Sequence, residues 1–513
     1  MKEMDLLLYN GTILTMDEKN TVKEWAVIKN GRIFDLGNGD GFKRYIEISN
    51  EALDLYGKTL LPGFYDSHVH LVQTGFNLLS LDASKIKCIP ELLELICSKS
   101  KKTVNGELIR VIGYDESKVA EKRLPTRYEL DNCSQNNPVW VNTIEYHTSV
   151  VNSLALHMLK LPFNLEGVMR DERNLPDGRF ISKASSMVRN NIFNMIDDNV
   201  RKEGVSKALN LAIENGVTSI NAMEGGFTFH DKDAKFISRN KDFFPIDIIL
   251  FYQTVDVKKV LNEGLNRIGG CIFLDGSFNS RTAALSESYY DDSSTSGILY
   301  FSQDELNKFV LEAHKNNMQI AIHAIGDKAI DQILNAYEYA LYLYPKKDHR
   351  YRIEHFELAT EKQINRAKKL NLILSMQPAY EYFWGGVGGM YDLRLGPKRS
   401  KTTNPLRKIV DKGLIIAGGS DSDVTPISPI LGIHTAVNHP TVESSVSVLE
   451  AIKMFTINGA KSVFEENIKG SIEIGKYGDF VILDKNPLNI EKTDIKDIKV
   501  EGTIKEGNIL FIE

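Results

Sequence analysis

The chain has 513 residues, of which 42% are apolar and 25% are charged, and its net charge at neutral pH is −6. This is the composition of an ordinary soluble globular protein, and it excludes a disordered or fibrous chain. The mild acidic excess also argues against a nucleic-acid-binding protein, which would carry a basic patch or tail.

The cysteines and the N-terminus indicate the compartment. The chain has 4 cysteines, at Cys88, Cys97, Cys133 and Cys271, which are too few and too scattered for a disulfide framework and favour a reducing environment. The first residues, MKEMDLLLYNG, carry acidic groups where a signal peptide carries basic ones. No apolar run reaches the length of about 18 residues that a membrane span needs. We therefore expect a cytoplasmic protein with no membrane partner.

Both ends of the chain have the texture of short strands separated by turns. Asn10-Gly11 and Asn30-Gly31 each lie between apolar runs, and both pairs predict β-hairpins. The last fifty residues repeat this texture in SIEIGKYGDFVIL and TIKEGNILFIE. We therefore expect the two ends to form one small β domain, with the rest of the chain inserted between them.

The middle of the chain alternates short β-rich runs with helical stretches such as 304–317 and 327–343, which is typical of βα units around a parallel sheet. Eight candidate strands precede loops with acidic residues or histidines, at 60–70, 217–224, 246–252, 270–275, 319–323, 351–355, 372–376 and 414–421. Eight such strands close a barrel. The stretch of about 145 residues after the first strand is too long for a βα loop and predicts an inserted subdomain or lid.

The segment LLPGFYDSHVHL places His68 and His70 two residues apart at the end of an apolar run. In a strand, residues i and i+2 point to the same face, so both imidazoles can reach one cation. The same arrangement recurs where three other strands end, at His323, His355 and Asp421. The carboxyl ends of barrel strands meet at one rim. Four imidazoles and a carboxylate there suit one or two divalent ions of the zinc, iron, manganese or nickel type.

These motifs resemble the amidohydrolase superfamily, and within it the YtcJ-like branch that includes N-substituted formamide deformylases. The resemblance runs nearly end to end, and the following segments carry it: PGFYDSHVH, LDGSFNSRTAAL, HAIGDKAID, RIEHFEL, GGSDSDV and NIKGSIEIGKYGDFVIL. It implies an α/β fold with a distorted (βα)8 TIM-type barrel and a β-sandwich formed by the N- and C-terminal segments. The implied barrel covers 61–461 with its insertion at about 72–215, and the implied sandwich covers 1–60 plus 462–513.

The resemblance also implies roles for the rim residues. His68 and His70 would bind the more buried metal, and His323 and His355 a second or alternative metal, with zinc favoured. Asp421 would be both a ligand and the proton shuttle. A bound cation lowers the pKa of a water molecule, and a nearby carboxylate can then accept its proton.

One position departs from the family pattern. Relatives carry a lysine four residues before the Asp-Gly of the fourth strand, whose carboxylated form bridges two metals, but this chain has Cys271 in GGCIFLDG. A thiolate can bind zinc, but a free cysteine can equally be a small buried apolar residue. Glu224, at the end of VTSINAME, is the second candidate for this place, and its alternative is an exposed loop glutamate. A mononuclear site stays open.

Three further residues are candidates for substrate binding. Arg281 could hold a substrate carboxylate or carbonyl with its planar guanidinium, or form a structural ion pair. Arg399 resembles an arginine common in the branch, with a solvated surface charge as its alternative. Trp384 precedes glycines that would let its loop move, and it either lines a pocket or packs in a lid.

The leading hypothesis is a metal-dependent hydrolase of a carbon–nitrogen bond other than a peptide bond, in an amide, N-formyl compound or cyclic amide. One alternative is a deaminase of an aromatic amidine, although the sequence HAIGD lacks the glutamate that such an enzyme uses near His323. Another is an inactive relative that serves as a ligand-binding or regulatory module. The expected partner is a small-molecule substrate, and a homodimer is the expected assembly for an enzyme of this size.

Overall fold

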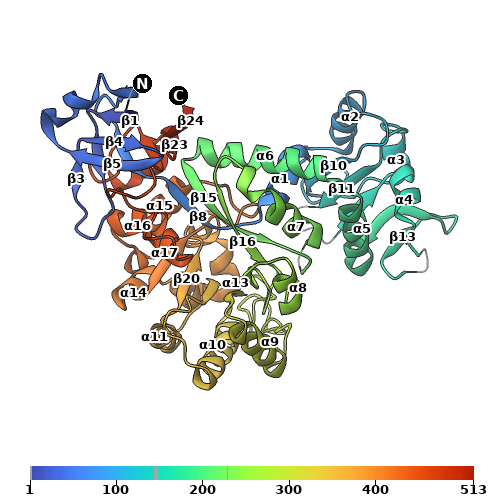
Figure 1. Ribbon diagram of the computed structural model, residues 1–513. Helices are drawn as coiled ribbons and strands as arrows, with labels where there is room; N and C mark the ends of the chain where they lie inside the picture. The colour runs from blue at the N-terminus through green and yellow to red at the C-terminus, as the bar shows by residue number, and fades with distance from the viewer. Residues whose placement is uncertain (1–2, 144–147, 163–164, 228) are drawn as a thin grey trace. The chain divides into compact units, whose positions relative to one another are not determined.

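The computed structural model describes residues 3–143, 148–162, 165–227 and 229–513. The chain divides into two compact units (Figure 1). The first consists of Met1–Leu71 and Leu209–Glu513, and the second of Val72–Ala208. The chain of the first unit is therefore interrupted by the whole of the second.

A parallel sheet of eight strands forms the centre of the first unit. In spatial order the strands are β8 (Phe64–Val69), β15 (Val217–Glu224), β16 (Asp247–Tyr252), β17 (Arg267–Ile268), β18 (Gln319–Ala324), β19 (Arg352–His355), β20 (Ile373–Met376) and β21 (Ile415–Gly418). The two outer strands approach each other, because the Asp421 amide donates to the His68 carbonyl at 2.8 Å and the His70 amide donates to the Ser422 carbonyl at 2.6 Å. The sheet is thus a nearly closed barrel of the α/β class.

The strands of the barrel are buried on both faces, and their sequences combine apolar residues with buried polar ones. Helices connect them, among them α9 (Gln303–Lys315), α10 (Asp327–Leu343) and α11 (Glu361–Lys369). Ser302 is the N-cap residue of α9 and Thr360 that of α11, each with a capping box to the glutamate or glutamine three residues later. The other helices on this part of the chain are α7 (Asp231–Asn240), α8 (Val257–Asn262), α12 (Ala379–Trp384), α13 (Met390–Arg399), α14 (Leu406–Asp411), α15 (Pro429–Val437), α16 (Val448–Met454) and α17 (Ile457–Ser462).

Two of the predicted strands are wrong in their bounds. Residues 60–62 belong to β7 (Thr59–Pro62) of a different sheet, and only Phe64–Val69 enters the barrel. The fourth strand lies at Arg267–Ile268 rather than at 270–275, because Gly269 and Gly270 follow it with φ of 95° and 58°. Such left-handed backbone ends the strand. Beyond it, only an isolated bridge between Phe273 and His323 continues the ladder.

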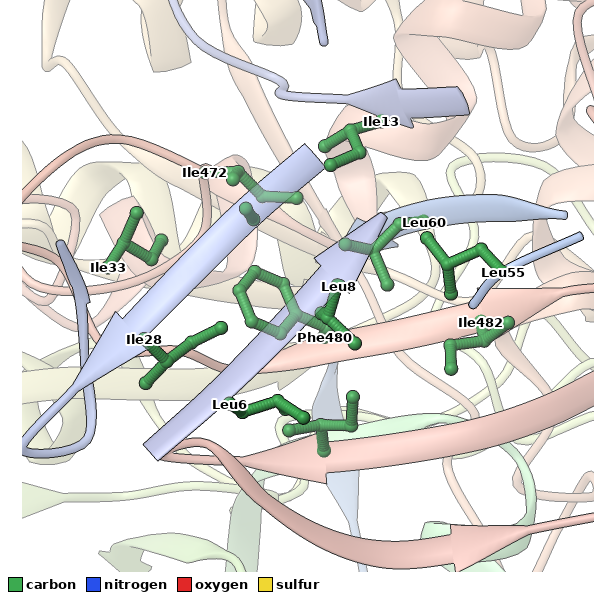
Figure 2. Close-up of a cluster of buried hydrophobic side chains, with 12 residues drawn as sticks. Leu6, Leu8, Ile13, Ile28, Ile33, Leu55, Leu60, Ile472, Phe480 and Ile482 are labelled. Carbon is green, nitrogen blue, oxygen red and sulfur yellow. The ribbon is translucent and has the colours of Figure 1, made fainter. Parts of the chain in front are cut away.

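Strands from both ends of the chain share a six-stranded sheet. Its order is β24 (Asn508–Ile512), β23 (Val500–Lys505), β22 (Phe480–Leu483), β7, β2 (Thr12–Leu14) and β3 (Val22–Lys23). A four-stranded sheet accompanies it, with the order β5 (Arg32–Gly37), β4 (Trp25–Lys29), β1 (Met4–Tyr9) and β6 (Ser49–Asp54). Side chains from both sheets, including Leu8, Ile28, Leu60 and Phe480, form one buried apolar cluster (Figure 2).

Only one of the two predicted hairpins forms. Asn30 and Gly31 both have positive φ, 52° and 73°, and connect β4 to its antiparallel partner β5. Asn10-Gly11 is not a hairpin turn, because β1 pairs with β4 and β6 whereas β2 pairs with β3 and β7. The turn instead passes the chain from one sheet to the other.

The second unit contains its own six-stranded sheet. Its order is β13 (Val168–Arg170), β14 (Pro176–Ile181), β12 (Thr148–Val151), β11 (Val139–Thr143), β10 (Ile109–Tyr114) and β9 (Leu81–Asp82). The helices here are α2 (Ile89–Ser100), α3 (Arg127–Asp131), α4 (Ser153–Leu159) and α5 (Ser182–Met195), while α1 (Leu71–Leu79) and α6 (Asp198–Glu214) span its boundaries. A disulfide joins Cys97 on α2 to Cys133 after α3, although the cysteine spacing did not predict a bridge. Within the described residues, no helix has the length and apolar character needed to cross a membrane.

Candidate metal centre

Five predicted ligands meet at the carboxyl edge of the barrel. His68 and His70 lie at the end of β8, His323 on β18, His355 at the end of β19, and Asp421 just after β21. All five side chains are buried. Strands that are far apart in sequence therefore place their polar residues at one edge, as expected for a barrel of parallel strands.

The ligand atoms form two groups of buried residues. In one group, Oδ1 of Asp421 lies 3.3 Å from Nε2 of His68 and 3.1 Å from Nε2 of His70. The other group joins His68, Cys271 and His355. Within each group, the candidate atoms lie within 4.8 Å of one another, so one cation can contact all of them.

Two atoms at the centre of the first group make no hydrogen bond in the structure, namely Nε2 of His68 and Oδ1 of Asp421. Buried polar atoms are normally satisfied, and a buried one without a partner calls for an explanation. Imidazole nitrogens and a carboxylate oxygen that converge in this way are a donor set suited to a divalent transition metal. The residues present therefore fit such an ion.

The opposite ring nitrogens of the histidines are held by the protein. His68 Nδ1 lies 2.6 Å from Oε2 of Glu354, and His355 Nδ1 lies 2.7 Å from Oε1 of Gln377. His70 Nδ1 lies 3.1 Å from the Met223 carbonyl. Such contacts fix the orientation and tautomer of an imidazole, so that its other nitrogen is available to the centre.

His323 is oriented through its other nitrogen. Its Nε2 lies 3.3 Å from Oδ1 of Asp275 and 3.3 Å from the Gly276 carbonyl, so that Nδ1 faces the centre. Asp275 is fully buried and accepts hydrogen bonds from the backbone amides of Ala284, Ile325 and Gly326 at 2.7–3.0 Å. This carboxylate thus fixes two loops of the rim relative to His323.

Glu354 connects the centre to a buried arginine. The guanidinium of Arg352 contacts both Glu354 oxygens, at 2.8 and 2.9 Å, and donates to the Ser67 carbonyl at 2.6 Å. Burial alone would raise the pKa of Glu354, but Arg352 and His68 lower it below its usual value. Sequence reasoning did not identify Arg352, Glu354, Asp275 or Gln377.

Asp421 has two different surroundings for its two oxygens. Oδ1 faces His68 and His70, whereas Oδ2 accepts a short hydrogen bond from the Tyr380 hydroxyl on α12. Burial would raise the pKa of Asp421, but the two histidines hold it well below the usual value. The carboxylate is therefore ionised at neutral pH, and its Oδ1 faces the two imidazoles. Tyr380 is another contact that the sequence did not signal.

The backbone is strained at two of the candidate ligands. His355 has a φ of 71° and Asp421 a φ of 53°, in the left-handed region that side chains other than glycine rarely adopt. Such conformations cost about 1–3 kcal/mol and persist where the surrounding structure enforces them, often at functional sites. His355 is the last residue of β19, and Asp421 lies three residues after the end of β21, so both conformations occur where the chain leaves a strand.

Cys271 and Glu224 are the two candidates to replace the bridging lysine of the relatives, and the structure places them differently. Cys271 lies in the second ligand group, and its thiol is surrounded by imidazoles. Burial disfavours its thiolate, but the four histidines outweigh this and hold the pKa of Cys271 well below its usual value. Glu224 is buried but belongs to neither group. A role for Glu224 at the centre stays a prediction.

The predicted substrate-binding residues all have protein partners. Arg281 forms an ion pair with Asp291 through two hydrogen bonds, at 3.1 and 2.8 Å. Arg399 donates to the carbonyls of Leu395 and Ser288, at 2.9 and 2.7 Å. Trp384 packs against a buried cluster that contains Tyr380. A substrate role for these three stays a prediction, since their contacts also suit the structural alternative.

Comparison with known proteins agrees with this geometry. A model of the amidohydrolase family matches residues 51–511. The chain is 28% identical to a Bacillus subtilis protein designated amidohydrolase YtcJ, over 99% of both chains, and 27% identical to the N-substituted formamide deformylase of Arthrobacter pascens, over 99% of this chain and 98% of that one. A metal-dependent hydrolase from Pyrococcus furiosus superposes with a TM-score of 0.80 at 28% identity, covering 94% of this chain and 100% of that one.

The family match covers most of the chain, and its relatives align along nearly their whole length. The resemblance read from the sequence is thereby confirmed. The chain belongs to the amidohydrolase family, as a metal-dependent hydrolase of carbon–nitrogen bonds other than peptide bonds.

Proposed function

We propose that this chain hydrolyses a carbon–nitrogen bond in an amide, N-formyl compound or cyclic amide of small size, with zinc as its metal and Asp421 as its proton shuttle. The observation that carries the proposal is the convergence of buried ligand atoms from His68, His70 and Asp421, of which Nε2 of His68 and Oδ1 of Asp421 make no hydrogen bond. The proposal takes the eight-stranded sheet as a distorted (βα)8 TIM-type barrel with its chemistry at the carboxyl edge.

A divalent cation bound by His68, His70, His323, His355 and Asp421 would supply a Lewis acid, which lowers the pKa of water and polarises a carbonyl group. Asp421 accepts the proton of the attacking water, because its Oδ1 faces the position towards which Nε2 of His68 and Nε2 of His70 also point. The same carboxyl group then delivers that proton to the leaving nitrogen. Tyr380 holds Oδ2, so that Oδ1 keeps its direction towards the centre.

The relatives support the substrate class. One relative is named for its action on N-substituted formamides, and it aligns over nearly the whole chain. The chemistry that this site requires is the same for a formamide, another amide or a cyclic amide, because each offers a carbonyl carbon bonded to nitrogen.

The test is a substrate panel with protein of known metal content. Protein purified without chelator is analysed for bound metal, stripped, reloaded with zinc and offered N-substituted formamides, simple amides, cyclic amides and aromatic amidines. We expect hydrolysis of at least one carbonyl substrate by the zinc-loaded protein and none by the stripped protein. Reaction with the amidines alone, or no reaction by fully loaded protein, would contradict the proposal.

A further inference from the structure

The Cys271 side chain lies between the two parts of the candidate metal centre. Its Sγ is 3.7 Å from Nδ1 of His323 and 3.9 Å from Nε2 of His355. Cys271 also forms one group with His68 of β8 and His355, whose candidate ligand atoms lie within 4.8 Å of one another. One sulfur atom is thus in contact with the nitrogens that face the centre from three strands of the barrel.

These separations are those of atoms that share one ion. Zinc lies about 2.3 Å from sulfur ligands and about 2.0–2.1 Å from imidazole nitrogens, and a tetrahedral angle between such bonds puts sulfur and nitrogen about 3.6 Å apart. A weak thiol hydrogen bond to one imidazole would explain one short distance. Two similar distances to imidazoles of different strands indicate a shared position for a cation.

The backbone places the sulfur there by a specific irregularity. Gly269 and Gly270 have positive φ and end β17, and a Cβ atom on Gly269 would lie only 2.1 Å from the Ala321 carbonyl oxygen. The chain can therefore pass directly beside β18. Gln253 then fixes the next residue, because its Nε2 donates to the Cys271 carbonyl at 2.8 Å.

Cys271 has apolar neighbours on one side and imidazoles on the other. The residue belongs to a buried apolar cluster with Met223, Phe251 and Ala321, which accounts for the packing of its backbone and Cβ. Its sulfur is on the polar side, against the imidazoles.

We propose that Cys271 is a thiolate ligand of the metal centre, in one ligand set with His323, His355 and His68. This inference deepens the proposed function and rests on it for the presence of a metal. When the ion binds, the thiol loses its proton to solvent and sulfur forms the bond to the metal. A sulfur ligand selects zinc, cobalt or cadmium over magnesium, calcium and manganese, which prefer oxygen.

The first test uses cobalt as a spectroscopic probe of the full chain. Stripped protein is titrated with Co²⁺, and its absorption spectrum is recorded for the wild type, Cys271→Ser and Cys88→Ser. Cys88 is the other free cysteine and lies in the second unit, so its variant is the matched control. We expect a sulfur-to-cobalt charge-transfer band in the near ultraviolet for the wild type and Cys88→Ser, and complete loss of that band in Cys271→Ser. A band that persists in Cys271→Ser would overturn the inference.

The second test needs no variant, so a failure of Cys271→Ser to fold does not affect it. X-ray absorption of the zinc-loaded wild type is expected to show one sulfur scatterer at about 2.3 Å. A first shell of nitrogen and oxygen alone would overturn the inference while leaving the hydrolase proposal intact. A sulfur scatterer in a protein that hydrolyses nothing would support the inference on Cys271 and contradict the hydrolase proposal.

Discussion

The two edges of the barrel both bury charged groups, but in different ways. At the amino edge, Nζ of Lys505 lies 2.9 Å from Asp247 and 3.0 Å from both Asp479 and Glu506. At the carboxyl edge, Nε2 of His68 and Oδ1 of Asp421 have no hydrogen bond. The charges at the amino edge compensate one another, whereas the carboxyl edge presents donors that point at a common position.

This difference predicts that variants at one edge affect the stability of the fold and variants at the other affect metal binding and the reaction. Removing one partner from a buried ion pair leaves an uncompensated charge and destabilises the fold. Changing a ligand at a converging donor set instead affects the ion and the reaction. Variants at the amino edge should therefore alter stability with little effect on metal, and variants at the carboxyl edge should do the opposite.

The largest expected effect comes from Asp421→Asn. The amide is nearly isosteric but cannot accept the proton, so turnover should fall about 10²–10⁴-fold while much of the metal stays bound. The measurement is kcat on the best substrate of the panel, together with metal per chain. Asp423→Asn, on the same loop but in neither ligand group, is the matched control. Equal kcat values for Asp421→Asn and wild type would remove Asp421 from the mechanism.

At the amino edge, Lys505→Met tests the architectural half of the comparison. It leaves Asp479 and part of the charge of Asp247 buried without their cation, so the first unit should lose about 3–5 kcal/mol of unfolding free energy. Denaturant unfolding measures this loss, and elemental analysis should show the same metal content as in the wild type. The exposed Lys485→Met should change stability by less than about 0.5 kcal/mol. A Lys505→Met variant with unchanged stability and reduced metal content would contradict the assignment of the amino edge to stability.

The residues that meet in the candidate metal centre could be predicted from the sequence because each follows an apolar run. His68 and His70 share a face by the two-residue period of a strand, and His323, His355 and Asp421 lie at or just beyond the ends of other strands. The eight-strand count was sufficient for the α/β class. The fourth strand was misplaced, although Gly269-Gly270 was a visible signal of a strand end.

The residues that orient the ligands could not be predicted, for a physical reason. Glu354 contacts His68 across 286 positions of sequence, and Tyr380 contacts Asp421 across 41. Such pairs depend on which strands are neighbours and on how side chains turn at the strand ends. The order of the strands determines which strands are neighbours. The direction of the side chains depends in addition on the left-handed backbone at His355 and Asp421, which no local sequence pattern predicts.

Glu354→Gln tests one of these orienting residues. The amide can still accept from His68 Nδ1, but the negative charge that Arg352 and His68 share is lost. Loss of such a partner lowers metal affinity about 10–100-fold, and chelator competition measures this change. The matched control is Glu338→Gln, in an ion pair with Arg366 on the helices outside the barrel. Affinities within twofold of the wild type would show that Glu354 does not position His68.

A histidine at the amino edge gives the smallest effect and completes the comparison. His349, before β19, uses both nitrogens within the protein, because Nε2 lies 2.8 Å from the Leu370 carbonyl and Nδ1 accepts from the Tyr351 amide at 2.9 Å. Burial lowers the pKa of His349 to about 4, whereas the unfolded chain should titrate near 6.5. Between these values the unfolded state binds the extra proton, so this contribution to stability is lost as the pH falls.

We expect this one group to cost about 1–2 kcal/mol of unfolding free energy between pH 7 and about 5.5. Other histidines also titrate in this range, so the informative quantity is the pH slope of wild type minus that of His349→Gln, measured by denaturant unfolding of zinc-loaded protein. A flatter slope for the variant with unchanged metal content is the expected result. Identical slopes would mean that His349 binds a proton in the folded state, and that the amino edge does not hold its histidine neutral.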